Sequence, residues 1–244
     1  MINFLGNPDP KNRNALNHEC RGMKLIILAL APVILIAIFI YYRDKYEKEP
    51  LRLLIKSLVA GMLITIPIIL VEKGLSFLLP YLPKNLRAFY TAFIVAAVTE
   101  EVFKYTAFYL LIWKNKNFNE KFDGIVYAVY ISLGFAAVEN IGYVLQFGEA
   151  TGYIRALASV PAHALFGVTM GYYFGLAKFY LGQKKLFLLR AIMYPVIIHG
   201  VFDFILMSGN YRVLFGFIPY VAFLYIDGIR RMNNLSRRSI YRNK

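Results

Sequence analysis

Apolar runs of roughly 20 residues recur along most of this 244-residue chain. A helix needs about 20 mostly apolar residues to cross a membrane, because the hydrocarbon core of a bilayer is about 30 Å thick. The chain is 59% hydrophobic and 17% charged, whereas a soluble domain averages about 45–50% and about 25%. The sequence therefore predicts an all-α, polytopic transmembrane helix bundle of about seven spans, at residues 23–42, 54–72, 88–113, 123–147, 154–178, 186–208 and 211–230.

The segments between these runs are short, which leaves no room for a soluble domain. The first run, 23–42, is longer than the apolar core of a signal peptide, which has about 7–15 residues, and no small-residue cleavage site follows it. We therefore expect it to be a retained helix. The predicted division is a polar N-terminal segment at 1–22, a helix-bundle domain at 23–230 and a basic tail at 231–244.

The formal net charge of +14 comes mostly from Lys and Arg clusters between the apolar runs. Such clusters mark the cytoplasmic side of a membrane protein, and with seven spans they predict a cytoplasmic C-terminal tail and an external N-terminus. The basic N-terminal segment argues against this orientation. No glycine-rich phosphate loop or zinc knuckle is present, so we expect the lipid bilayer and no nucleic acid as a partner. Cys20, the one cysteine, excludes internal disulfides and multi-cysteine metal sites.

Ionisable residues inside the predicted spans are the candidate functional residues. A charge in the hydrocarbon region is costly, and it usually faces a cavity or the interior of the bundle. Asp227 lies near the cytoplasmic end beside Arg230 and Arg231, and we expect it to pair with them. The others are Glu100, Glu101 and Lys104 in 88–113, Glu139 in 123–147, His163 in 154–178, and His199 and Asp203 in 186–208.

Spacing sorts these residues into helix faces. Glu100 and Lys104 are four residues apart and share a face, whereas Glu101 points about 100° away from Glu100. His199 and Asp203 are again four apart, so the carboxylate can orient the imidazole. Each pair also has a purely structural interpretation, as an ion pair that stabilises the bundle.

Depth in the membrane favours a common site. With a rise of about 1.5 Å per residue, the candidates lie roughly 8–18 Å from the outer ends of four different spans. Unrelated structural residues have no reason to agree in depth. We therefore predict one polar site at the centre of the bundle.

Two imidazoles with several carboxylates, and no reactive cysteine, are typical of hydrolysis by either of two routes. In one, a buried carboxylate is the general base on water while the histidines donate to the developing oxyanion. In the other, His163, His199 and Glu139 hold a divalent metal ion that activates the water. Neither HExxH nor GxSxG is present, and hydroxyls in membrane helices usually bond to backbone carbonyls, so we expect no serine nucleophile.

Four short motifs resemble those of the PrsW family of bacterial intramembrane proteases. The stretch "EEVFK" at 100–104 is similar to the EExxK motif of that family, and "FAAVE" at 135–139 to its second motif, an aromatic residue followed four positions later by Glu. The stretches "HALFG" at 163–167 and "HGVFD" at 199–203 resemble its histidine motifs. They occur in the order of the family, on four successive spans, and cover roughly residues 90–210.

The resemblance implies a glutamic-type protease of the bacterial cell membrane that needs no cofactor, with the metal-dependent route left open. The family is distantly similar to the CAAX-protease and bacteriocin-processing membrane proteins. Its substrate would be a membrane-anchored protein, typically an anti-sigma factor, cut near the extracytoplasmic side. Lys104 would keep one carboxylate ionised, and Asp203 would orient His199. The catalytic residues implied are Glu100, Glu101, Glu139, His163 and His199, with one of the adjacent glutamates activating water.

Two other functions use similar residues. A proton- or ion-coupled transporter or channel also places Glu, His and Lys inside the membrane, but the sequence shows no internal repeat of the spans. A membrane scaffold without catalysis is the other alternative. Gly134 and Gly142 flank Glu139, and we expect them to leave room for an extended substrate. The glycines at 167, 171 and 175 are expected to pack against a neighbouring helix.

Overall fold

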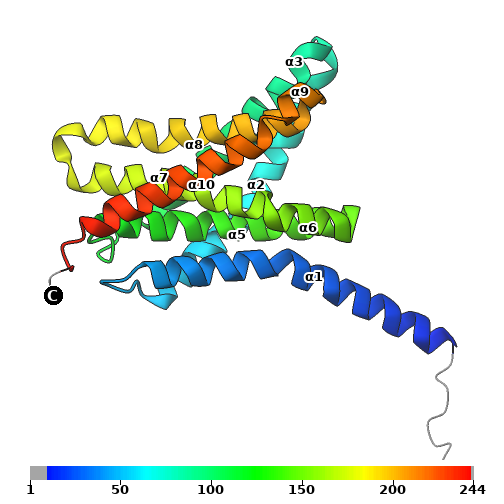
Figure 1. Cartoon of the computed structure of the whole chain (residues 1–244), viewed down its shortest axis with the longest axis horizontal. Helices are drawn as coiled ribbons and strands as arrows, with labels where there is room; N and C mark the ends of the chain where they lie inside the picture. Colours follow the sequence, from blue (N-terminus) through cyan, green and yellow to red (C-terminus); the bar gives the residue numbers. More distant parts are fainter. Residues whose placement is uncertain (1–9, 243–244) are drawn as a thin grey trace, which may run out of the picture.

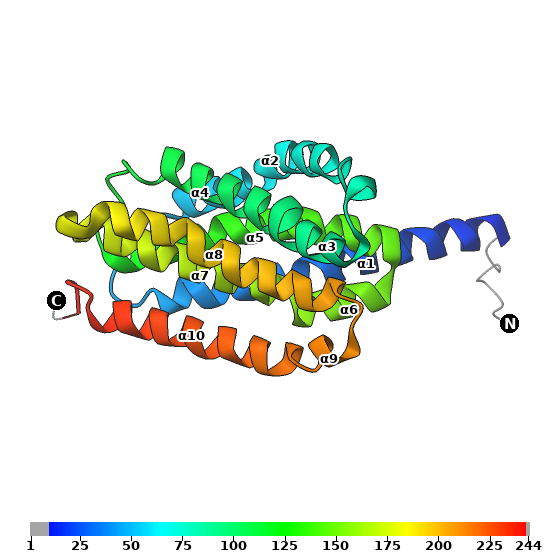
Figure 2. The same ribbon diagram turned by 90° about the horizontal axis from the view of Figure 1, so that it is seen from above.

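The computed structural model describes residues 10–242, with side chains from residue 22 onward. Helices form almost all of this part of the chain and it contains no strand, which confirms the predicted all-α bundle. Figures 1 and 2 show long helices lying side by side, with α1 extending beyond the others at one end. In chain order they are α1 (Pro10–Arg43), α2 (Leu51–Ser76), η1 (Leu79–Tyr81), α3 (Lys84–Phe89), η2 (Tyr90–Val98), α4 (Thr99–Leu111), α5 (Lys121–Phe147), α6 (Glu149–Leu157), α7 (Ser159–Phe179), η3 (Leu181–Gln183), α8 (Lys184–Met207), α9 (Tyr211–Leu214) and α10 (Phe217–Arg237).

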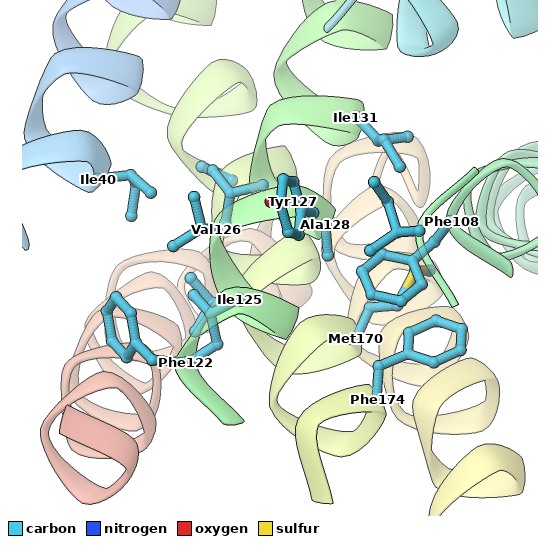
Figure 3. Close-up of a cluster of buried hydrophobic side chains, with 14 of the residues drawn as sticks. Ile40, Phe108, Phe122, Ile125, Val126, Tyr127, Ala128, Ile131, Met170 and Phe174 are labelled. Carbon is cyan, nitrogen blue, oxygen red and sulfur yellow. The ribbon is translucent and has the colours of Figure 1, made fainter. Parts of the chain in front are cut away.

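Helix α5 is the central element of the bundle. Its residues from Ile125 to Ala137 are almost all apolar or small, and nearly every one is buried, as expected for a helix surrounded by others. Helices α1, α2 and α7 pack around it. Figure 3 shows α5 side chains together with Phe108 and Phe174, whose rings stack with centroids 4.0 Å apart. This core holds α4, α5 and α7 in fixed relative positions.

Glycines let α5 approach its neighbours closely. An added Cβ at Gly171 would lie 2.2 Å from the carbonyl oxygen of Gly124, and one at Gly175 would lie 2.2 Å from that of Lys121. The predicted packing role of the α7 glycines is therefore confirmed. On the opposite side, a Cβ at Gly134 would lie 1.9 Å from the carbonyl oxygen of Leu58 in α2. The expectation that Gly134 leaves room for substrate is wrong, because α2 fills that space.

The two glycines that flank Glu139 are expected to respond differently to alanine. Gly134→Ala forces α2 and α5 apart and is expected to destabilise the protein by about 1–3 kcal/mol, as overpacking of a tight core does. Gly142→Ala is the matched control on the same helix, because a Cβ there meets nothing within 4 Å. Thermal unfolding in detergent measures both. Equal unfolding temperatures for the two variants would contradict the tight crossing of α2 and α5.

Five of the described helices are long and apolar enough to cross a membrane, so the predicted count of seven is not confirmed. Among the predicted spans outside this set, 88–113 is divided among α3, η2 and α4 and carries three charged residues near its middle. The span at 154–178 lies mostly in α7, whose glycines, tyrosines and His163 lower its hydropathy. The five helical stretches are Gly22–Arg43, Leu51–Tyr81, Lys121–Phe147, Leu181–Met207 and Tyr211–Arg237.

The predicted span 154–178 is also divided near its start. Helix α5 ends at Phe147. Gly148 follows with a φ of 83°, which suits glycine, and the short helix α6 then begins. Helix α7 then begins at Ser159. Pro161 stands in its first turn, where a missing N–H costs no helical hydrogen bond. The chain can therefore change direction between α6 and α7.

The ends of the chain differ from their predicted boundaries. Helix α1 begins at Pro10, inside the predicted polar segment 1–22, whose residues 1–9 lie outside the described residues. Helix α10 runs to Arg237, inside the predicted tail 231–244. The division of the chain into three parts stays a prediction.

A buried acidic group lies at the end of the bundle where α1 leads into α2. Asp44 is 1% exposed, and Glu49 is 4% exposed and accepts a hydrogen bond from the hydroxyl of Tyr127. Burial raises the pKa of Asp44 to about 7, helped by the negative charges of Glu49 and Glu120 and opposed by Lys48. Burial likewise raises the pKa of Glu49 to about 7. These carboxyls bind protons more tightly in the folded protein than in the unfolded chain.

Asp44→Asn is expected to stabilise the protein at pH 8 and to have little effect at pH 4. The folded pKa of about 7 exceeds the unfolded value of about 3.9, so the stabilisation is complete below about pH 4 and is lost as the pH rises through about 7. Each kcal/mol regained shifts the unfolding temperature by about 2–4 °C. The control is Asp227→Asn, because Asp227 already pairs with Arg231 at 2.5 Å. A gain at Asp44 that is independent of pH would contradict the assignment.

Candidate active site

The two adjacent glutamates follow the π-helical segment η2 at the start of α4. In a π-helix each backbone hydrogen bond spans five residues, and such segments often occur at functional sites. Segment η2 packs against α8, where an added Cβ at Gly200 would lie 2.3 Å from the ring of Phe93. This close approach brings the start of α4 next to His199.

Lys104 lies between the two glutamates and is 0% exposed. Its Nζ is 3.0 Å from Glu100 Oε2 and 2.9 Å from Glu101 Oε1. The sequence places the two carboxylates about 100° apart, but residues three and four positions away both neighbour a helical side chain. The long lysine side chain therefore reaches both carboxylates from the same helix.

Helix α8 adds His199 and Asp203 to the site. Nδ1 of His199 is 2.9 Å from Glu101 Oε1, and Nε2 is 3.2 Å from Asp203 Oδ2. The ring of Phe166 stacks on the imidazole with centroids 4.7 Å apart. The predicted pairing of His199 with Asp203 is therefore present, and both ring nitrogens face carboxylate oxygens.

Helices α5 and α7 add Glu139 and His163. Nε2 of His163 is 2.9 Å from Glu139 Oε2, and its Nδ1 is 3.4 Å from Lys104 Nζ. Nδ1 also lies 3.9 Å from Glu100 Oε2. His163 thus connects Glu139 on one side with the group around Lys104 on the other.

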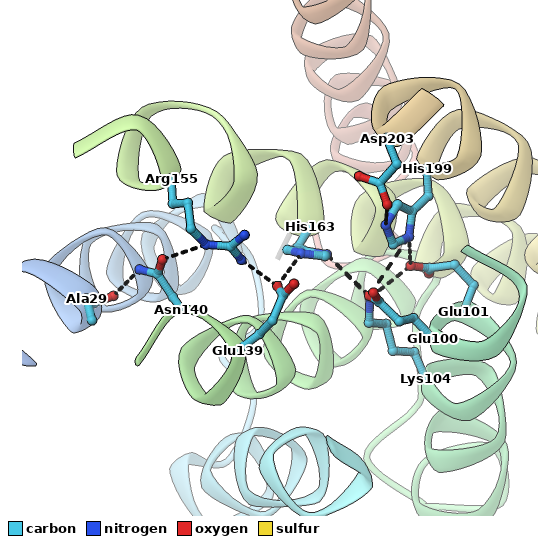
Figure 4. A network of polar contacts seen from close by, with 10 residues as sticks. All are labelled: Ala29, Glu100, Glu101, Lys104, Glu139, Asn140, Arg155, His163, His199 and Asp203. Carbon is cyan, nitrogen blue, oxygen red and sulfur yellow. Dashed lines mark hydrogen bonds and ion pairs between the residues drawn. The ribbon is translucent and has the colours of Figure 1, made fainter. Parts of the chain in front are cut away.

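Figure 4 shows these side chains as one network of polar contacts at the centre of the bundle. All seven residues singled out as site residues from the sequence take part: Glu100, Glu101, Lys104, Glu139, His163, His199 and Asp203. Their individual roles stay predictions. Asp227 lies elsewhere and pairs with Arg231, as predicted.

Sequence reasoning missed Arg155 and Asn140. Nη2 of Arg155 is 2.6 Å from Glu139 Oε2, and its Nε is 3.0 Å from Asn140 Oδ1. Arg155 falls inside the predicted run 154–178, so the rule that ionisable residues in spans are candidates would have found it. Asn140 gave no such signal, because one amide in a long helix is common.

A cavity of about 740 Å³ opens beside the network and is lined by residues of α2, η2, α4, α5, α6, α7 and α8. Glu100, Glu139, His163 and His199 line it, whereas Glu101 and Lys104 do not. Gly142 also lines it, as expected for a residue that leaves room for substrate. A volume of this size is within the range of ligand sites, about 300–1,000 Å³. The cavity therefore gives a bound chain access to some site residues and not to others.

The same group of side chains fits a divalent metal ion. One ligand atom from each of Glu100, Glu101, His163 and His199 lies within 4.8 Å of the other three. Metal-binding histidines usually donate their second N–H to a carboxylate, and here the Nε2 atoms of His163 and His199 face Glu139 and Asp203. This set of four possible ligands differs from the set expected from the sequence, which is His163, His199 and Glu139. Glu139 is not a member, because it contacts the other ring nitrogen of His163, Nε2. Lys104 Nζ contacts three of the same donor atoms.

Comparison with known proteins shows the family of the chain. The model of the family described as PrsW family intramembrane metalloprotease matches residues 49–226. The chain belongs to the PrsW family. It is therefore a multi-pass membrane protein of an intramembrane protease family, which confirms the resemblance of its four motifs.

Several curated relatives named Protease PrsW are similar over most of their length. The chain is 34% identical over 218 residues to that of Oceanobacillus iheyensis, covering 89% of this chain and 99% of the relative. It is 35% identical over 232 residues to that of Clostridioides difficile, covering 91% and 96%. It is 31% identical over 210 residues to that of Bacillus subtilis, covering 85% and 93%. No solved structure is significantly similar to the chain.

Proposed function

We propose that this PrsW-family protein hydrolyses a peptide bond of a membrane-anchored protein, of the anti-sigma-factor class, at the Glu100–His163–His199 face of the cavity. The observation that carries the proposal is the convergence of two imidazoles and two carboxylates from α4, α7 and α8 beside a cavity of about 740 Å³. Peptide hydrolysis requires an activated water and a donor to the developing oxyanion, and this set of groups supplies both.

The two glutamates have different surroundings, which supports different roles. Glu101 is 0% exposed and is held between Lys104 and His199, each at 2.9 Å. Glu100 lines the cavity and has one close partner, Lys104. A general base must reach the water beside the substrate. Glu100 therefore takes the proton from water, and Glu101 orients His199.

The family description as metalloproteases extends the proposal to a metal ion. His163, His199 and Glu101 would hold it, a set of two histidines and one carboxylate that resembles the three-ligand sets of catalytic zinc sites. When bound, a divalent ion supplies Lewis-acid activation of water and of the scissile carbonyl. Glu139 and Asp203 orient the two imidazoles from their far sides. Lys104 balances the charge of Glu100.

The proposed topology places the C-terminal tail in the cytoplasm of a bacterial cell, since the basic residues of 231–244 favour that side. The cut would then fall in the outer half of the membrane. The transporter alternative shares the buried charges, but membership of a protease family favours hydrolysis.

Reconstitution tests the proposed activity directly. The purified protein is placed in liposomes with a single-span anti-sigma factor that carries a tag at each end, and we expect a new fragment whose mass places the cut near the outer end of the span. Ion or proton flux without any fragment, across several single-span substrates, would support a transporter and reject the proposal.

A further inference from the structure

The side chain of Arg155 turns inward from helix α6, several of whose large apolar side chains are exposed. Its side chain is 12% exposed, whereas Tyr153, Ile154 and Leu157 of the same helix, α6, are 53%, 67% and 79% exposed. The guanidinium group turns inward, lines the cavity and lies 4.0 Å from the ring centroid of Tyr143. A charge so placed requires partners, and α5 supplies them.

The guanidinium group is fixed by a chain of hydrogen bonds that begins on α1. Nδ2 of Asn140 donates to the carbonyl oxygen of Ala29 at 2.8 Å, and Oδ1 of Asn140 accepts from Arg155 Nε at 3.0 Å. Arg155 Nη2 then donates to Glu139 Oε2 at 2.6 Å. Because a guanidinium group is planar and always charged, fixing Nε also fixes Nη2. Figure 4 shows this chain running from Ala29 to His163.

Glu139 Oε2 accepts from two groups, Arg155 Nη2 at 2.6 Å and His163 Nε2 at 2.9 Å. An ionised carboxylate only accepts hydrogen bonds, so the proton of a neutral His163 must lie on Nε2. Nδ1 then presents a lone pair toward Lys104 Nζ, which is 3.4 Å away and can only donate. Both contacts of His163 therefore require the same tautomer.

We propose that Arg155 is a positioning residue that, through Glu139, fixes the Nε2–H tautomer of His163 and keeps its Nδ1 lone pair directed at the reaction centre. Without Arg155, the Glu139 carboxylate loses the donor that sets its orientation, and the side chain is free to turn from His163. The effect on catalysis rests on the proposed function, whereas the effect on the tautomer does not.

Nitrogen NMR tests the tautomer. The protein is labelled with ¹⁵N-histidine, reconstituted in lipid and measured with and without a chelator, and His18→Gln and His199→Gln assign the signals of the three histidines. We expect His163 to show a protonated Nε2 and an unprotonated Nδ1. Arg155→Gln is expected to give a mixture of tautomers, and Arg155→Lys to keep part of the original signal.

The matched control is Glu149→Gln on the same helix, because Glu149 forms an exposed ion pair with Lys24 and does not touch the site. It is expected to leave the tautomer unchanged. An unchanged His163 signal in Arg155→Gln, or the opposite tautomer in the parent protein, would overturn the proposal. If Arg155→Gln fails to fold, Arg155→Lys is the deciding variant. If Arg155→Lys keeps both the parent NMR signal of His163 and full activity, the guanidinium group has no positioning role and the proposal is rejected.

Kinetics supply the second measurement. Arg155→Gln is expected to lower kcat about 10–100-fold, the usual effect of losing a group that orients a ligand residue, with little change in KM. Arg155→Lys should recover part of the loss. Combining Arg155→Gln with Glu139→Gln should cost little more than Glu139→Gln alone, since both act through one contact. Additive losses would contradict the proposal. Absence of protease activity in the parent protein would reject the proposed function. The proposal about the His163 tautomer would then be tested by the NMR measurement alone.

Discussion

Glu100→Gln is expected to lower the cleavage rate about 10²–10⁴-fold, the usual contribution of a general base, while the protein still folds. The amide keeps the shape of the side chain and can still accept from Lys104 Nζ, 3.0 Å from Glu100 Oε2, but it cannot take a proton from water. The measurement is the rate of fragment release in liposomes at saturating substrate. The loss should appear in kcat rather than in KM, since the carboxylate acts on the reacting water.

The control for Glu100 is Glu72→Gln. Glu72 lines the same cavity from α2, but it has no hydrogen bond to the histidines among the described contacts. It is expected to retain cleavage. Glu101→Gln should also lose activity, accompanied by a looser His199, because Glu101 holds that imidazole at 2.9 Å. Full activity in Glu100→Gln would reject Glu100 as the base, and activity lost only in Glu101→Gln would assign that role to its neighbour.

Metal removal is expected to abolish cleavage. Two imidazoles and two carboxylates lie within 4.8 Å of one another, and the family is described as metalloproteases. We expect about one divalent ion per chain in the protein as purified, loss of activity after dialysis against a strong chelator, and recovery when zinc is added back. Elemental analysis and fragment release measure the two effects on the same samples.

Asp203→Asn provides the matched test of the metal. The contact from Asp203 Oδ2 to His199 Nε2 is 3.2 Å. A neutral amide in its place makes a weaker contact, which is expected to weaken metal binding about 10–100-fold without removing a ligand. More zinc should then restore most of the activity. A protein that contains no metal and cleaves equally well in chelator would instead support water activation by Glu100 with Lys104 as the sole counter-ion.

The sequence selects ionisable side chains that the fold does bring together, because charges in apolar runs are costly. That rule alone selects Glu100, Lys104 and His163, and helical spacing correctly pairs His199 with Asp203. Neither rule predicts which side chains from different helices contact one another. Glu139, for example, contacts His163 and Arg155 rather than the two glutamates. Spacing within one helix says nothing about the rotation of its neighbours.

For the fold, too, the sequence predicts features that depend on neighbouring residues in the chain, but not contacts between helices that are distant in the sequence. Apolar runs predict helices because each backbone N–H and C=O must find a partner within its own helix in lipid. They do not predict how closely helices approach, and Gly134 illustrates this, because its contact is the backbone of Leu58, 76 positions earlier in the chain. The count of seven spans stays unconfirmed for a similar reason. Helix α7 is mostly buried among other helices, so it does not need the hydropathy of a lipid-facing helix.

The π-helical segment η2 has a consequence for how this chain tolerates changes in length. A loop accepts an inserted or deleted residue at little cost, but η2 leads without a break into α4. Deleting one residue between Tyr90 and Val98 would turn the whole of α4 by about 100° and draw it back by about 1.5 Å. Glu101 would then take the position of Glu100 relative to α8, and Glu100 that of Thr99. Across natural variation, the interval between the start of η2 and the two glutamates should therefore keep its length even where its residues change freely.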